Sequence, residues 1–218
     1  MNATDINVLI ACEESQAECK AFRALGLNAF SCDIQKCAGN HPEWHIIGDV
    51  TPYLMGTTQF TTMDGVQHDV HHWHLIVAHP PCTYLCRVSA SMHKRNNTWL
   101  PGYYDLMIQA REFFFTCLNA SADYVVVENP IPLREACLPK PAFYTCPSWF
   151  GYKYTKRTLW WTTSLPPVMP QLFHPFPKCY VTCSRGKYRS RTFPRVAEAC
   201  AQTWGTFVMD HLYKLKEL

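Results

Sequence analysis

A cysteine and a glutamate stand out because each follows an apolar run and each has a side chain that can act on a bound substrate. Cys82 directly follows Pro80 and Pro81, and Glu128 directly follows three valines. Two consecutive prolines stiffen the loop that presents Cys82, and a cysteine thiolate is a strong nucleophile. A carboxyl group after an apolar run must turn outward or find a donor, because its burial is costly. Taken alone, Cys82 is either a nucleophile or a small core residue.

More acidic residues follow other apolar runs. Glu13 and Glu14 come after residues 6–11, and Asp33 and Asp49 come after two later runs. Asp33 stands close to the offset of about 20 residues at which an acid binds ribose hydroxyls in nucleotide-binding sheets. A turn aspartate or a helix cap is the alternative interpretation for each acid taken singly.

The elements that must position these residues alternate between strands and helices. Apolar, β-branched runs predict strands at 6–11, 27–32, 44–47, 74–78, 124–127 and 158–162, whereas helical spacing predicts helices at 17–25, 103–118 and 194–215. Residues 51–73 and 165–193 are expected to be irregular excursions. Trp160 and Trp161 are adjacent on a predicted strand, so one ring should point inward and the other outward.

This alternation predicts an α/β protein whose mostly parallel sheet is covered by helices on both faces. Ligands of such sheets bind outside the carboxyl ends of the strands. The acidic residues, Cys82 and Glu128 all follow predicted strands, so we expect them to converge on one cleft. Helix caps alone would account for an acid or two, but not for the Pro-Pro-Cys turn.

Composition limits the class of protein. The chain has 218 residues, of which 48% are hydrophobic and 17% charged. These values favour one globular domain over residues 1–218 and exclude a disordered chain. No apolar run approaches the roughly 18 residues of a membrane span, and residues 1–7 do not resemble a signal peptide. We therefore expect a soluble, cytoplasmic protein with no membrane partner, and with its 12 cysteines reduced.

The order of the candidate residues matches a known series of motifs. They are Asp33, Gly48-Asp49-Val50, Pro80-Pro81-Cys82, Glu128-Asn129-Pro130 and Lys156-Arg157. This series resembles the DNA cytosine-5 methyltransferases, in particular the short, phage-associated group that is cytosine-methyltransferase-like. The similarity to the short group also includes residues 10–16, 31–34, 79–85 and 191–194. Only about 29 residues are available for the target-recognition domain of the large enzymes, too few for a separate domain.

The resemblance implies a Rossmann-like class I fold that binds S-adenosylmethionine and transfers its methyl group to carbon 5 of cytosine in DNA. Cys82 would be the covalent nucleophile, Glu128 would hold the ring, and Arg157 or Lys156 would favour the thiolate. Asp33 would bind the ribose hydroxyls and Asp49 the adenine amine. The full set of expected cofactor residues is Cys12, Glu13, Glu14, Ser15, Asp33, Ile34, Asp49, Val50 and Pro80.

Basic residues near the expected cleft predict contacts with nucleic acid, although a solvated loop is the alternative for the C-terminal group. They are Arg87, Lys94, Arg95, Arg185, Lys187, Arg189 and Arg191. The partner is expected to be DNA or a pyrimidine nucleotide. The alternatives are modification of a free or single-stranded pyrimidine nucleotide, or a non-catalytic phage protein that binds nucleic acid or a nucleotide. If the protein is phage-encoded, its location would be the host cytoplasm.

Two other groups of residues have competing interpretations. Four histidines crowd residues 68–74, and Cys82 with Cys86 and Cys179 with Cys183 repeat a spacing that suits zinc. No pair of CxxC knuckles accompanies them, so no metal is predicted. Trp99, Tyr103 and Tyr104 either stack on bases or belong to an aromatic core.

Overall fold

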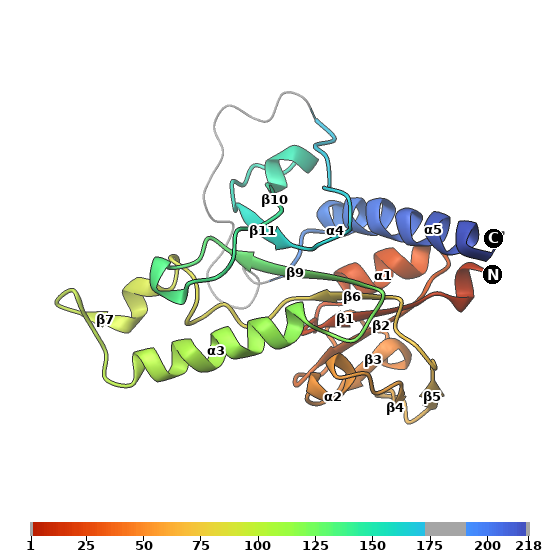
Figure 1. Cartoon of the computed structure of the whole chain (residues 1–218), viewed down its shortest axis with the longest axis horizontal. Coiled ribbons are helices and arrows are strands. Elements are labelled where there is room, and N and C mark those ends of the chain that lie inside the picture. Colours follow the sequence, from red (N-terminus) through yellow and green to blue (C-terminus); the bar gives the residue numbers. More distant parts are fainter. Residues whose placement is uncertain (1, 173–190, 217–218) are drawn as a thin grey trace.

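The computed structural model describes residues 2–172 and 191–216, and its centre is a seven-stranded sheet (Figure 1). The strands of this sheet are β1 (Asn7–Ala11), β2 (Asn28–Asp33), β3 (His45–Ile47), β6 (Leu75–Ala78), β9 (Tyr124–Pro130), β10 (Phe143–Thr145) and β11 (Thr158–Trp161). Their spatial order is β10-β11-β9-β6-β1-β2-β3. Five neighbouring strands, β9, β6, β1, β2 and β3, are parallel to one another. Strand β11 is antiparallel to β9, and β10 is antiparallel to β11.

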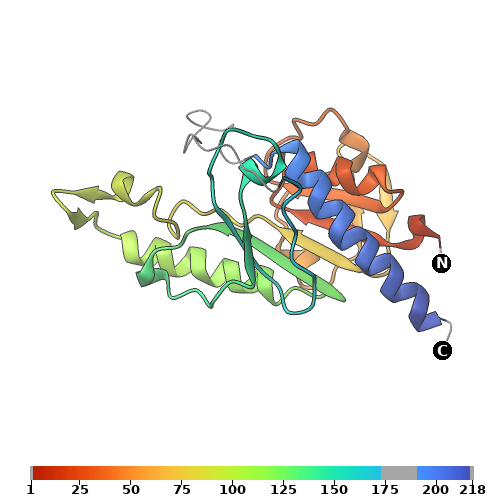
Figure 2. The same ribbon diagram turned by 90° about the horizontal axis from the view of Figure 1, so that it is seen from above.

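Helices cover both faces of the sheet. They are α1 (Ala17–Ala24), α2 (Thr51–Leu54), α3 (Tyr103–Leu118), α4 (Pro194–Cys200) and α5 (Thr206–Lys216), with a π-helical segment (Ala201–Gly205) that makes α4 and α5 continuous. α1, α4 and α5 lie on one face of the sheet, while α2 and α3 lie on the other (Figures 1 and 2). The fold is therefore α/β with a mostly parallel central sheet, as the sequence predicts.

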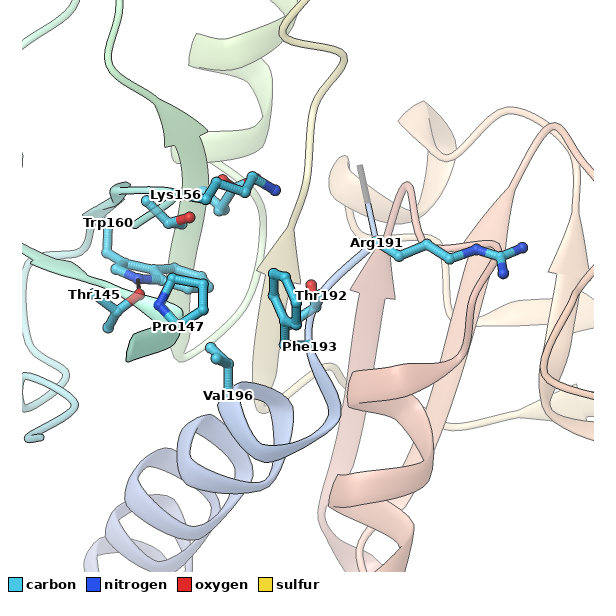
Figure 3. Close-up of a pocket in the computed structure, with 10 residues that line it drawn as sticks. Thr145, Pro147, Lys156, Trp160, Arg191, Thr192, Phe193 and Val196 are labelled. Atoms are coloured by element: carbon cyan, nitrogen blue, oxygen red, sulfur yellow. Dashed lines mark hydrogen bonds between the residues drawn. The ribbon is translucent and has the colours of Figure 1, made fainter. Parts of the chain in front are cut away.

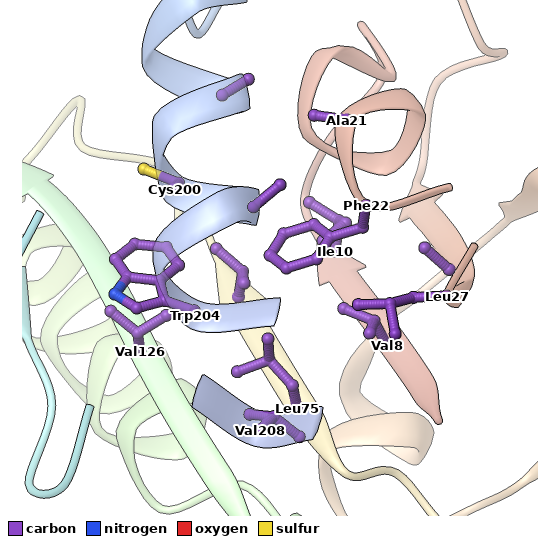
Figure 4. Close-up of a cluster of buried hydrophobic side chains, with 14 of the residues drawn as sticks. Val8, Ile10, Ala21, Phe22, Leu27, Leu75, Val126, Cys200, Trp204 and Val208 are labelled. Atoms are coloured by element: carbon purple, nitrogen blue, oxygen red, sulfur yellow. The ribbon is translucent and has the colours of Figure 1, made fainter. Parts of the chain in front are cut away.

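Strand β1 shows why the sheet must be covered twice. All five of its residues are buried, and successive side chains point to opposite faces. Ile10 packs on the first face with Phe22 of α1 and Trp204 of the π-helical segment (Figure 4). Leu9 packs on the second face in the cluster that contains Phe114 of α3.

The same coverage overturns the expectation for the tryptophan pair. Trp160 is 1% exposed and Trp161 2% exposed. Trp160 belongs to the hydrophobic cluster under α1 and α4, and Trp161 to the cluster on α3. The rings do point in opposite directions, but helices cover both sides of β11, so the prediction that one ring faces solvent is wrong.

The expected strands and helices are confirmed to within a few residues, but the connections contain more structure than expected. Residues 51–73 hold α2 and a hairpin of β4 (Gln59–Thr61) and β5 (Gln67–Asp69). A second hairpin, β7 (Lys94–Arg95) with β8 (Thr98–Trp99), projects from the body beyond α3 (Figures 1 and 2). Strand β10 is not among the strands that the sequence predicts. No described helix is long and apolar enough to cross a membrane.

The predicted excursion at 165–193 is described only at its two ends. Its first part packs onto the core, because Leu165 and Val168 are buried against the first hydrophobic cluster. Trp204 secures this part by donating its indole N–H to the Pro166 carbonyl, 3.1 Å away.

The carboxyl ends of the parallel strands meet at one edge of the sheet, and strand order reverses there between β1 and β6. Backbone hydrogen bonds tie the loops at this edge together. The N–H of Glu13 donates to Cys32, that of Gly48 to Asp33, and that of His79 to Ala11. Such a reversal point is where open α/β sheets bind ligands.

Candidate functional site

A pocket opens at this edge, between β9, β11 and the start of α4 (Figure 3). The space between its lining residues is about 350 Å³ when the part open to solvent is included, but its enclosed volume is only about 20 Å³. The lining residues are Glu128, Thr145, Pro147, Lys156, Thr158, Trp160, Arg191, Thr192, Phe193 and Val196. Four of these residues are aromatic or aliphatic, three carry hydroxyl groups, Glu128 is acidic, and Lys156 and Arg191 are basic. Apolar walls with a few polar groups are typical of small-molecule sites.

Glu128 is the acid of this pocket. Burial alone would raise the pKa of its carboxyl, but a hydrogen bond from His79 and the charge of Lys156 lower that pKa below its ordinary value. Glu128 is therefore a carboxylate at neutral pH. Its Oε1 atom is buried and accepts no hydrogen bond from the described residues, so a ligand with an N–H group would satisfy it.

His79 connects this carboxylate to α1. Its Nδ1 atom lies 3.5 Å from Oε2 of Glu128, and its Nε2 atom lies 3.2 Å from Oε2 of Glu18. The second contact is an ion pair without good hydrogen-bond alignment. Burial works to lower the pKa of His79, yet the two glutamates raise it well above its ordinary value. Sequence reasoning missed His79 and Glu18, although the position of His79 directly before the Pro-Pro turn was a usable signal.

Lys156 and Arg157 separate in the structure. Lys156 lines the pocket and interacts electrostatically with both Glu128 and Cys82. Arg157 places its guanidinium over the ring of Tyr144, 4.5 Å from the ring centre. Between these two expected cations, Lys156 is thus the one placed at the pocket.

Cys82 is partly exposed on the loop after β6 and interacts electrostatically with Glu128. It also hydrogen-bonds to Cys86, one helical turn later, a second sulfur that the sequence analysis considered only as a zinc ligand. That bond, followed by burial, raises the pKa of Cys82. The same bond lowers the pKa of Cys86, although burial opposes this change. Ser89 supports the Cys86 sulfur from 3.2 Å. These opposite shifts favour Cys86 over Cys82 as the sulfur that carries a negative charge.

Glu13 and Ser15 have structural partners. Glu13 accepts the backbone N–H groups of Glu18 at 2.7 Å and Cys19 at 3.2 Å, which are unpaired donors of the first turn of α1. Ser15 donates to Glu13 and accepts from Ala17. Burial and the nearby Glu18 raise the pKa of Glu13 to about 7. Both residues therefore act as the cap of α1, one of the alternatives open from sequence.

Glu14 pairs with Arg191 across 177 positions of sequence. Two guanidinium nitrogens lie 3.1 and 3.3 Å from its two carboxylate oxygens. Figure 3 shows the Arg191 guanidinium extending away from the pocket. The pair connects the loop after β1 to the segment that enters α4.

A second group of expected cofactor residues gathers at the ends of β1, β2 and β3. Cys12, partly exposed, feels the charges of both Asp33 and Asp49, and they help to raise its pKa after burial. Asp33 accepts the N–H of Gln35, and Asp49 accepts the N–H and hydroxyl of Thr51, each through Oδ1. The expected neighbours differ in exposure: Ile34 is 78% exposed, whereas Val50 and Pro80 are buried.

The loop from β1 to α1 contains no glycine, yet it makes a tight turn. Cys12 and Gln16 both adopt a positive φ, at 61° and 57°, a conformation that glycine usually supplies. The side chain of Gln16 exchanges two hydrogen bonds with the backbone of His41. A Cβ at Gly39 would approach Gln16 to 2.5 Å, so Gly39 packs directly on this turn.

The expected nucleic-acid residues fall into two groups. Arg87, Lys94 and Arg95 are exposed on the loop and hairpin beyond Cys82, whereas Arg185, Lys187 and Arg189 lie outside the described residues. The ammonium of Lys94 lies 4.0 Å from the centre of the Trp99 ring, which stacks on Tyr103. Tyr103 is buried while Tyr104 is half exposed. Tyr103 thus belongs to the core. The hairpin has a basic surface, and its Lys94 lies over the aromatic ring of Trp99.

Within residues 2–172 and 191–216, no three His, Cys, Asp or Glu side chains are grouped as a metal site would require. The histidines at 68–74 have separate partners: Thr62 for His68, Asp69 for His71, Asp123 for His72, and the backbone of Asn7 for His74. Cys179 and Cys183 lie outside the described part of the chain.

No protein-family model matches the chain, and no curated protein matches it.

Proposed function

We propose that this protein is a Rossmann-like methyltransferase that modifies carbon 5 of a cytosine, with S-adenosylmethionine as methyl donor. One observation carries the proposal: a proline-stiffened cysteine, Cys82, lies within electrostatic range of both the pocket carboxylate Glu128 and the pocket cation Lys156. Addition of a thiolate to a pyrimidine needs this combination of a nucleophile, a group that holds the ring, and a positive charge.

The residues at the ends of β1, β2 and β3 fit the donor. Asp33 and Asp49 present carboxylates near Cys12 at the carboxyl ends of β2 and β3, where they suit ribose hydroxyls and an adenine amine. Ile34 offers an exposed apolar side chain next to Asp33. Glu13 is committed to α1 and Glu14 to Arg191, so these two acids would shape the loop without binding the donor directly. When bound, S-adenosylmethionine supplies an electrophilic methyl group.

The chain's own residues would prepare the base. The Cys82 sulfur forms a bond to carbon 6, and its proton passes to the Cys86 sulfur. The electron pair of the 5,6 double bond then makes carbon 5 a nucleophile. Glu128 accepts the exocyclic amine, and Lys156 balances the negative charge that develops. After carbon 5 gains the methyl group, the proton on carbon 5 passes to water, the 5,6 double bond re-forms and the bond between carbon 6 and the Cys82 sulfur breaks. The departing Cys82 sulfur then takes back its proton from Cys86.

Single-stranded DNA is the substrate form that the described surface favours. A duplex base must first be flipped out, at a cost of a few kcal/mol that an enclosing protein surface offsets. The described residues contain no separate unit for this purpose, but the hairpin beyond Cys82 combines Lys94 and Arg95 with Trp99. Basic and aromatic side chains together bind single strands without needing a duplex.

A methyl-transfer assay on single-stranded, duplex and free cytosine nucleotides tests the proposal. We expect Cys82→Ser and Glu128→Gln each to reduce the rate by at least about 100-fold. Circular dichroism must show that both variants stay folded. Cys137→Ser is the matched control, because Cys137 is exposed and remote in sequence from the pocket residues, and it should transfer methyl groups at the wild-type rate.

Calorimetry with S-adenosylmethionine separates failure of the donor site from failure of the base site. Binding without transfer to any cytosine substrate would contradict the base assignment. Absence of binding would contradict the whole methyl-transfer class. Full biological activity in Cys82→Ser would instead favour a non-catalytic nucleotide-binding protein.

A further inference from the structure

His79 is a buried histidine whose two ring nitrogens both face carboxylates. Its side chain is 13% exposed, that of Glu128 is 14% exposed, and Glu18 is fully buried. A neutral imidazole carries a proton on one nitrogen only, so its other nitrogen would oppose a carboxylate lone pair. Only the imidazolium, with protons on both nitrogens, suits the 3.2 and 3.5 Å contacts.

The backbone fixes where this ring lies. The N–H of His79 donates to Ala11 at the end of β1, and Pro80 restricts the conformation of the preceding residue. The ring also meets Trp160 edge-on, with 6.2 Å between the ring centres. His79 therefore occupies a built position between α1 and the pocket wall, rather than a flexible surface position.

The buried carboxylate of Glu18 favours the positively charged form of His79. No donor among the described residues makes a hydrogen bond to either of its oxygens, and a buried carboxylate without compensation is expensive. The imidazolium supplies that compensation. Its remaining N–H then reaches Glu128, and it uses only the Oε2 atom of that carboxylate.

We propose that His79 is a positioning residue that, paired with Glu18, keeps Glu128 ionised and oriented with Oε1 available to the amine of a bound base. The inference deepens the proposed function, because it rests on the pocket accepting a cytosine. His79 acts through Glu128 and does not itself need to touch the ligand.

The charges around His79 come from every element packed on it. Glu13 in the loop before α1, Glu18 on α1 and Glu128 on β9 interact with His79 itself. Lys156, before β11, interacts with Glu128, and the thiol of Cys200 on α4 with both Glu18 and Glu128. Three carboxyl groups thus share two cations. Burial first, and then the charge of Glu18, raise the pKa of Glu13 to about 7.

The first experiment is NMR on the free protein between pH 5 and 9, with labelled histidine rings and glutamate carboxyls. We expect His79 to carry both ring protons at pH 7.5 and the pKa of Glu128 to rise in His79→Gln. In Glu18→Gln the imidazole should lose its proton at a lower pH than in the wild type. A neutral His79 ring at pH 7.5 in the wild type would overturn the inference.

The second experiment measures binding of a short single-stranded oligonucleotide with one cytosine. His79→Gln should weaken binding about tenfold or more at pH 6.5, one factor of ten for each unit by which the pKa of Glu128 in the variant exceeds the pH. The deficit should shrink by pH 8.5, because Glu128 regains its charge there. A deficit of equal size at every pH would indicate a purely structural role and overturn the inference.

His72→Gln is the matched control, since it removes another histidine–carboxylate pair, 2.9 Å to Asp123 and half exposed. It should bind the oligonucleotide as the wild type does at both pH values. The NMR measurement needs neither methyl donor nor transfer, so failure of the proposed function and failure of this inference give different results.

Discussion

Buried ionisable groups at the pocket differ in how folding shifts their pKa values. Folding raises the pKa of His79 and that of Glu13 but lowers that of Glu128. A raised pKa means that the folded protein binds more protons than the unfolded chain, so stability falls as pH rises through the interval. For Glu13 this interval runs from about 4.5 to about 7, and for His79 it begins near pH 6.5 and extends upward. Glu128 has the opposite effect, below about pH 4.5.

We therefore expect the free energy of unfolding to fall between pH 5.5 and 8.5. Each unit of displaced pKa corresponds to about 1.4 kcal/mol. In His79→Gln the fall should be smaller at the upper end of this range, where His79 loses its proton in the wild type, whereas the raised pKa of Glu128 would add to the fall at the lower end. Urea denaturation at several pH values checks this, with His72→Gln as control. A wild type that grows more stable over this range would contradict the assignment of His79 as a charged, buried group.

Helix α1 depends on a side chain from outside its own first turn. Its N-terminal residue, Gln16, makes no side-chain cap, and its side chain binds His41 instead. Glu13 fills the role from the preceding loop with two backbone hydrogen bonds. Because α1 also carries Glu18, the cap helps to set the position of the His79 ion pair.

Glu13→Ala should destabilise the protein by about 1–2 kcal/mol, the usual cost of a lost helix cap. The measurement is urea denaturation at pH 5.5, below the raised pKa of Glu13, because at higher pH the cost of its buried charge would mask the loss of the cap. Lys20→Ala, an exposed change on the same helix, is the control and should cost less than about 0.5 kcal/mol. Equal stability of Glu13→Ala and wild type would show that the first turn of α1 is satisfied in another way.

Because helices cover both faces of the sheet, adjacent residues of one strand are both buried in the core. Trp160 donates its indole N–H to Thr145, and Trp161 donates to the carbonyl of Pro139. Each ring also packs against a different hydrophobic cluster. The two tryptophans therefore connect the antiparallel end of the sheet to both helical layers.

Trp160→Ala and Trp161→Ala should each destabilise the protein by about 3–5 kcal/mol, as large core truncations do. Thermal unfolding followed by circular dichroism measures the two changes. Tyr104→Ala, at a half-exposed position on α3, serves as control and should have little effect. If Trp161→Ala matched the control, the second helical layer would not enclose the sheet as described.

The sequence by itself determined the sheet and the arrival of Cys82, Glu128, Asp33 and Asp49 at its carboxyl edge, because apolar runs, strand-ending prolines and helical spacing are local signals. Only the tertiary structure decided what those residues touch. Glu13 caps helix α1, and Glu14 forms an ion pair with Arg191. Cys82 forms a hydrogen bond with Cys86, and His79 lies between the carboxylates of Glu18 and Glu128. These pairings depend on distances between segments that are far apart in the chain. They also depend on burial, because burial raises the free-energy cost of an unpaired charge. The local pattern of residues encodes neither quantity.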